Sequence, residues 1–286
     1  MRKLAIRSKI FYSVTAFSIT LAGYSQIAPE YFSSGNIIVN LPELGGPVSD
    51  SNKTTTLVRE NSIAFISEEV AIHKIEDYKD YKAAIADYTE AIKLFPNFEL
   101  AYYNRGLARD SLQDYRRAIS DYNRTIMINP QNVKAYGNRG IAKANLQNYS
   151  GAIADFNKVI EINPYDAKAY LNRGVVRADC FRDYRGAISD YSKSIGLDPE
   201  FAATYYNRGL ANYNIQEYSN AIADFSKAIE LNPKDGEAFY NRGMAEFKLD
   251  LTESAYQDFS KAGEAGYMMA FETIRKYSKF KRRWGN

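Results

Sequence analysis

The spacing of small, apolar and polar residues predicts pairs of short helices. Residues 133–144 and 150–161 both have helical composition, and the residues between them suit a tight turn. Pro164 is expected to stop the second helix, and Asp166 can cap the next one. A hairpin of two such short helices cannot bury its apolar face alone, so we expect successive hairpins to stack.

This pattern recurs along the chain. The tripeptide Asn-Arg-Gly occurs five times, at steps of 34, 34, 35 and 34 residues. Its glycines are Gly106, Gly140, Gly174, Gly209 and Gly243. In most copies Ala-Ile-x-Asp-aromatic follows, as at 118–122, 152–156 and 221–225, and a proline closes the unit. Such near-identical copies predict an array of repeats over residues 65–269.

The period and the order aromatic, Gly, Ala, aromatic, Pro resemble the tetratricopeptide repeat. The resemblance implies an all-α fold, a right-handed superhelical solenoid of stacked antiparallel helix hairpins with a concave groove. We expect six repeats, the first degenerate and the fourth with one extra residue in its internal turn. They cover 65–98, 99–132, 133–166, 167–201, 202–235 and 236–269. A capping helix at 270–280 and a basic tail at 281–286 are expected to follow.

The first residues have the order of a secretory signal. Basic residues precede an apolar stretch at 10–22 and then small residues, so we expect 1–25 to be a signal peptide cut after Ser25. An uncleaved membrane anchor is the alternative, although the stretch is short for a span. Residues 26–64 lack a helical or strand period and predict a flexible linker. The protein is thus expected to be exported, either periplasmic or secreted.

Composition narrows the possible functions. Residues 1–25 hold four bases and no acid, and the last twelve hold six bases, so the body between has 27 basic against 34 acidic residues. An acidic body disfavours nucleic-acid binding. The single histidine, His73, and the single cysteine, Cys180, argue against a zinc site. We find no catalytic set and no phosphate loop. We therefore expect no enzyme activity and no small-molecule cofactor.

One face of each first helix is predicted to line the groove. Residues turn by about 100° along a helix, which places the asparagines of Asn-Arg-Gly opposite the packing glycine. With their apolar neighbours they predict a site for an extended peptide or partner protein. The predicted residues are Tyr103, Asn104, Leu107, Asn138, Ile141, Leu171, Asn172, Val175, Tyr206, Asn207, Leu210, Tyr213, Tyr240, Asn241, Met244 and Phe247.

Two alternatives to this site remain open. A tightly wound superhelix or the linker could cover the groove, and each asparagine could bond to the next repeat instead of to a peptide. The alternative function is a self-associating structural or assembly protein of the cell envelope, whereas the peptide-binding reading favours a monomer.

Two further columns of charged residues predict internal ion pairs. The arginines are Arg105, Arg139, Arg173, Arg208 and Arg242, and the aspartates are Asp121, Asp155, Asp190, Asp224 and Asp258. The arginines point about 100° from the asparagines, toward the helix packing. Because a buried charge must be paired, we expect a structural Arg–Asp ladder.

Overall fold

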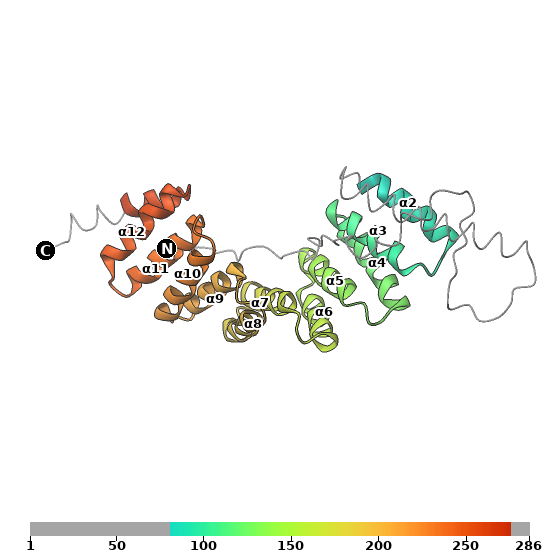
Figure 1. The fold of residues 1–286 in the computed structure, drawn as a ribbon, viewed down its shortest axis with the longest axis horizontal. Coiled ribbons are helices and arrows are strands. Elements are labelled where there is room, and N and C mark those ends of the chain that lie inside the picture. The colour runs from blue at the N-terminus through green and yellow to red at the C-terminus, as the bar shows by residue number, and fades with distance from the viewer. Residues whose placement is uncertain (1–80, 276–286) are drawn as a thin grey trace, which may run out of the picture. The chain divides into compact units, whose positions relative to one another are not determined.

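The computed structural model describes residues 81–275, and every regular element among them is an α-helix (Figure 1). The predicted signal peptide, the linker and the basic tail lie outside the described residues. So do His73, the first helix of the first predicted repeat and the end of the predicted capping helix. The all-α class is confirmed, and consecutive helices pack as hairpins of a tetratricopeptide-like solenoid.

The helices are short and similar in length. They are α2 (Tyr81–Leu94), α3 (Glu99–Ser111), α4 (Tyr115–Ile128), α5 (Val133–Asn145), α6 (Tyr149–Ile162), α7 (Ala167–Phe181), α8 (Tyr184–Leu197), α9 (Ala202–Asn214), α10 (Tyr218–Leu231), α11 (Gly236–Lys248) and α12 (Thr252–Glu264). Odd-numbered helices from α3 to α11 are the first helices of repeats. A further helix covers 269–275, up to the end of the described residues.

The turns explain where the helices stop. Within repeats, the chain reverses through residues with positive φ, such as Gln113 at 60° and Gln216 at 67°. Between repeats, Asp166 caps α7 by accepting from the backbone N–H of Ala169 at 2.9 Å, as predicted.

The extra residue of the fourth repeat does not lie in the internal turn, where the sequence predicted it. It lengthens α7 to 15 residues instead of enlarging the turn, and Arg182 alone takes the left-handed conformation, at φ 55°. α7 is two residues longer than the other first helices, which have 13, and the turn after it is one residue shorter, because continuing the helix keeps the backbone hydrogen-bonded.

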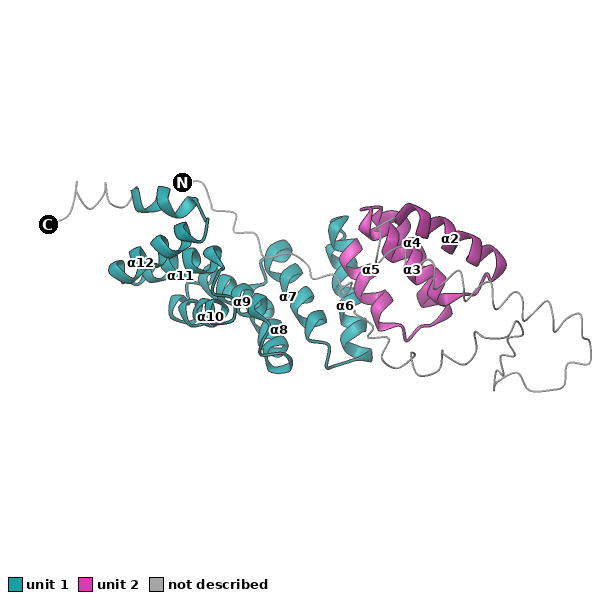
Figure 2. Cartoon of the chain, turned by 45° about the horizontal axis from the view of Figure 1, so that its top comes forward, with its two compact units in different colours: residues 1–12, 143–286 teal, residues 13–142 magenta. Residues whose placement is uncertain are grey.

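The contacts divide the chain into two compact units with a boundary inside α5 (Figure 2). One unit contains the described residues 81–142, and the other contains 143–275. Each has its own buried clusters of alanines and aromatic rings.

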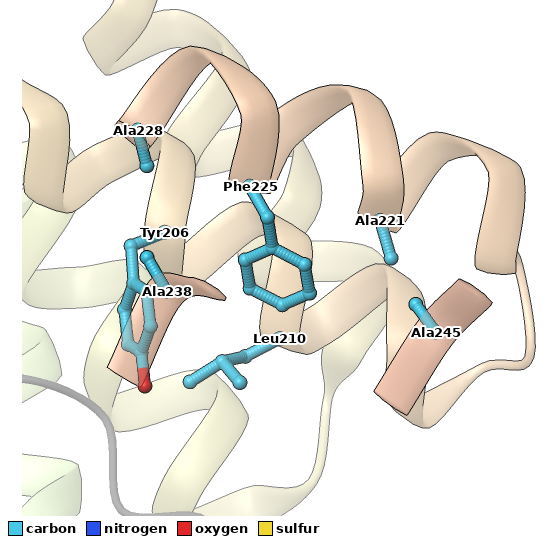
Figure 3. Packing of buried hydrophobic residues seen from close by; sticks show 7 residues of the cluster. All are labelled: Tyr206, Leu210, Ala221, Phe225, Ala228, Ala238 and Ala245. Carbon is cyan, nitrogen blue, oxygen red and sulfur yellow. The ribbon is translucent and has the colours of Figure 1, made fainter. Parts of the chain in front are cut away.

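In the second, fourth, fifth and sixth repeats, the core of the hairpin is an aromatic ring laid on a glycine. A Cβ added to Gly174 would lie 2.6 Å from Cε1 of Tyr191, and one added to Gly209 would lie 2.8 Å from Cε1 of Phe225. In Figure 3 the Phe225 ring points toward Leu210 of α9, with alanines of α11 on either side. The glycine thus lets the two helices approach, and the next repeat completes the core.

Candidate partner-binding site

The predicted groove face is less exposed than expected. Five of the predicted residues, Tyr103, Leu107, Tyr213, Met244 and Phe247, are half-buried. The others are buried: Asn104, Asn138, Ile141, Leu171, Asn172, Val175, Tyr206, Asn207, Leu210, Tyr240 and Asn241. The expectation of a broad exposed apolar surface is therefore wrong for most of this face.

The cause is the stacking of repeats. Tyr206 and Leu210 of α9 belong to the same cluster as Ala238 and Ala245, which come from the first helix of the next repeat. Tyr240 of α11 likewise packs with Ala270, beyond the end of α12. Helical geometry places these residues on one face, but the following element covers much of it.

Two asparagines of the column bond to the preceding repeat. The Asn138 amide donates to the Tyr103 hydroxyl at 3.1 Å, and the Asn241 amide donates to the Tyr206 hydroxyl at 2.9 Å. Burial raises the pKa of Tyr103 to about 12, so its hydroxyl stays protonated and accepts this bond. For Asn138 and Asn241 a bond between repeats is confirmed, but the partner lies in the preceding repeat and not in the next one as the alternative had it.

The central asparagines differ. Asn207 is 1% exposed, and neither its amide oxygen nor its amide nitrogen has a hydrogen-bond partner in the described protein. Asn241 bonds to Tyr206, the fifth residue of the preceding repeat. The corresponding residue before Asn207 is Leu171, which has no hydroxyl. Asn172, which is 3% exposed, also has an unpartnered amide oxygen. Asn104, which is 8% exposed, has an amide nitrogen without a partner among the described residues as well. Buried amides without partners are uncommon and costly, and in Asn207 both amide atoms lack a partner.

The predicted Arg–Asp ladder is confirmed in four repeats. Its shortest contacts are Arg105–Asp121 at 2.8 Å, Arg173–Asp190 at 2.6 Å, Arg208–Asp224 at 2.6 Å and Arg242–Asp258 at 2.6 Å. In the third repeat Asp155 pairs with Lys143 at 2.8 Å. The aspartates are almost fully buried, so their pairing holds the two helices of a repeat together.

Each ladder arginine makes two further contacts that sequence reasoning missed. Arg173 donates to Asn157 on the second helix of the preceding repeat at 2.7 Å, and Arg208 and Arg242 bond to serines at 3.0 Å in the same way. Arg173 also lies over the Tyr170 ring, 5.5 Å from its centroid. The sequence could have predicted these bonds, because a small polar residue directly follows the buried aromatic residue of the second helix in these repeats. One arginine therefore joins two repeats.

In the second to fifth repeats, a donor further along the first helix contacts the ladder aspartate. One turn after the ladder arginine lie Arg109, Lys143, Arg177 and Asn212, and each contacts its aspartate at 2.6–2.9 Å. The sixth repeat has Glu246 there, 6% exposed. Ser254 donates to one carboxylate oxygen at 2.7 Å, and the other oxygen has no partner. Among the described residues, Arg242 thus pairs with Asp258 alone, and the buried carboxylate of Glu246 has no cation in direct contact.

We expect Glu246→Gln to stabilise the protein near neutral pH. Burial, followed by the charge of Asp258, raises the pKa of Glu246 above its usual 4.5. A carboxyl whose folded pKa is raised gives stability that is complete below pH 4.5 and lost as the pH rises through the folded value. The glutamine variant should melt at a higher temperature than the parent near neutral pH, and this gap should close in acid.

Glu230→Gln is the matched control, because Glu230 is an exposed glutamate of the same unit. It should leave the pH profile unchanged. A Glu246→Gln profile parallel to that of the parent would contradict the assignment.

No group of three or more potential metal ligands lies together within residues 81–275. Over that same stretch, no helix has the length and apolar character that a membrane crossing requires.

Comparison with known proteins agrees with the repeat geometry. Three models of the tetratricopeptide repeat family match residues 79–132, 111–177 and 202–235. A search of the curated proteins found no match.

Several solved structures are similar. MamA is 25% identical over 58% of this chain and 96% of its own, with a TM-score of 0.54. YrrB is 19% identical over 66% and 97%, with a TM-score of 0.57. PilW is 19% identical over 74% and 98%, with a TM-score of 0.64. The last two likenesses concern the fold alone.

The family models that match describe repeats and no catalytic domain, and proteins made of such repeats are usually non-catalytic scaffolds. With the glycine–aromatic cores, the Arg–Asp ladder and the helix hairpins, these matches identify the chain as a tetratricopeptide repeat protein, a scaffold that binds other proteins.

Proposed function

We propose that this protein is an exported, non-catalytic scaffold that binds an extended segment of a partner protein along the first helices of its repeats. YrrB is described as a tetratricopeptide repeat protein with an unusual peptide-binding site, and PilW as a type IV pilus biogenesis factor. These descriptions favour peptide binding and an envelope role for a chain of similar fold. Export rests on the order of residues at the N-terminus.

The unpartnered amides of Asn172 and Asn207 carry the proposal. An asparagine side chain offers a donor and an acceptor, as does each peptide unit of an extended chain. Such a partner supplies the hydrogen bonds that these amides lack, whatever its sequence. The half-buried rings of Tyr213 and Phe247 lie on the same helix face and add apolar contact. Because both asparagines are nearly covered in the free chain, binding requires their side chains to turn outward.

The test compares two pairs of asparagines, using a peptide selected from a random 12-residue library by the full chain. Asn172→Ala with Asn207→Ala should weaken binding by at least about 1 kcal/mol, the scale of one net hydrogen bond. The melting temperature should hardly change, because no bond inside the protein is lost. Calorimetric titration and thermal melting measure the two quantities.

Asn138→Ala with Asn241→Ala is the matched control. These residues bond to tyrosines of the preceding repeats, so this variant should lose stability. If the central pair lowers the melting temperature and leaves the affinity unchanged, the whole column is structural and the peptide site is wrong.

Self-association is the second candidate function. Met268 is 69% exposed, Met269 46% and Phe271 43%, which leaves apolar surface near the end of the described chain. Light scattering over a range of concentrations separates the candidates: a monomer favours the peptide scaffold, and a concentration-dependent oligomer favours assembly.

A further inference from the structure

The second repeat carries a carboxylate where the other described repeats are apolar. Asp110 is the twelfth residue of its repeat, and the corresponding residues are Ala144, Ala178, Tyr213 and Phe247. Two of these four, Tyr213 and Phe247, belong to the candidate binding face. Asp110 therefore brings a charge to a position that packing elsewhere fills with methyl groups or rings.

Asp110 lies beside the aromatic ring at the centre of its hairpin. It follows Gly106 by one helical turn, so the two positions are neighbours on α3. The Tyr122 ring rests on Gly106, where an added Cβ would lie 2.6 Å from its Cε1. After burial itself, the charge of Asp110 is the largest cause of the raised pKa of Tyr122. The same charge also raises the pKa of Tyr115, after burial.

No group in the described protein satisfies this carboxylate. One oxygen of Asp110 is buried without a hydrogen-bond partner, and so is the hydroxyl of Tyr122, whose residue is 0% exposed. The nearby guanidiniums are engaged elsewhere, because Arg105 and Arg109 contact Asp121 at 2.8 and 2.6 Å. Burial with no compensating cation raises the pKa of Asp110 to about 6.

The surroundings favour a cation. The rings of Tyr103 and Tyr122 are tilted by 49° with centroids 6.1 Å apart, and Tyr115 starts the facing helix α4. Aromatic faces attract cations, and more strongly where water is partly excluded. A carboxylate oxygen and a tyrosine hydroxyl oxygen can both accept from an ammonium or a guanidinium group.

We propose that Asp110, together with Tyr103, Tyr115 and Tyr122, binds the cationic side chain of a lysine or arginine residue in the partner. The cation supplies the charge that Arg105 and Arg109 give to Asp121, and it donates to the two oxygens that lack partners. Both oxygens are covered in the free chain, so binding requires the side chains over them to move aside. This inference rests on the proposed function for its biological meaning, since it adds a preference for a basic residue to a site that otherwise recognises backbone and apolar groups.

The test uses small probes, so it does not depend on the peptide site. The full chain, with isotope-labelled aspartate and tyrosine side chains, is titrated with the methylamides of N-acetyl-lysine, N-acetyl-arginine and N-acetyl-norleucine. Nuclear magnetic resonance follows the Asp110 carboxyl and the rings of Tyr103 and Tyr122. The lysine or arginine probe should lower the pKa of Asp110 and shift these rings. Norleucine, which has a similar chain without the charge, should bind at least about tenfold more weakly, the factor for one charged hydrogen bond.

Neighbouring repeats supply the variants. Asp110→Ala copies the alanine of the third and fourth repeats, and Tyr122→Phe copies Phe156 and Phe225, so both changes fit the fold. The first should abolish the preference for a cation over norleucine, and the second should weaken it. Glu90→Gln, which removes an exposed acid from the same unit, should leave it unchanged.

Equal binding of the lysine and norleucine probes would overturn the proposal, as would an undiminished preference in Asp110→Ala. If the cationic probes bind at Asp110 but no library peptide binds the chain, the cation site stands and the proposed peptide function fails. If peptides bind without any preference for a basic residue, the proposed function stands and the cation site fails.

Discussion

Replacing Gly174 with leucine is expected to lower the free energy of unfolding by about 2–3 kcal/mol. A Cβ at this position would lie 2.6 Å from Cε1 and 2.9 Å from Cδ1 of Tyr191, well inside van der Waals contact. Tyr191 is fully buried and closes the core of the fourth repeat, so its ring cannot move without separating α7 from α8. Chemical denaturation measures the loss.

Gly196→Ala is the matched control. A Cβ added there meets nothing within 4 Å. Alanine favours a helix over glycine by up to about 1 kcal/mol, so this variant should be as stable as the parent or slightly more stable. If Gly174→Leu unfolds at the same denaturant concentration as the parent, the ring does not rest on the glycine and the packing of the hairpin is misassigned.

Replacing Asp190 with alanine is expected to cost about 3 kcal/mol, the scale for removing one partner of a buried ion pair. Asp190 is 3% exposed and accepts from Arg173 at 2.6 Å and from Arg177 at 2.8 Å. Both guanidiniums would stay half-buried without a counter-charge. Arg173 also bonds to Asn157, so the loss should weaken the contact between the third and fourth repeats. Denaturant unfolding measures the total cost.

The pair Lys158–Glu161 is the control for charge removal. It is a surface contact at 2.6 Å, with side chains 34% and 68% exposed. Removing it with Glu161→Gln should cost less than about 0.5 kcal/mol, because water screens exposed pairs. Equal losses from the two variants would show that the ladder is no more than a set of surface ion pairs.

The repeats share one set of stabilising contacts and differ from one another at other positions. The arginine contacts, the glycines and the second-helix aromatics stabilise the second, fourth, fifth and sixth repeats in the same way. Positions such as those of Asp110, Leu171 and Glu246 differ between repeats, and Asp110 and Glu246 each have a buried oxygen without a hydrogen-bond partner in the described protein. Constant packing with local exceptions suits a protein whose binding site is spread over several repeats.

The sequence by itself determined the repeat, the helix pairs and the ion pairs. A glycine and an aromatic residue at fixed offsets predict a close helix contact, and Asp166 predicts a cap, because both depend on local geometry and residue size. The Arg–Asp ladder followed from the cost of burying an unpaired charge.

Only the tertiary structure decided which of the predicted face residues are exposed. A turn of about 100° per residue fixes the side of a helix but not what covers it. Tyr206 and Leu210 are buried because the first helix of the next repeat packs on them. The fate of each asparagine depends on a residue one repeat earlier: Tyr206 satisfies Asn241, whereas Leu171 offers nothing to Asn207. Such differences arise from contacts between repeats, so the pattern within one repeat cannot reveal them.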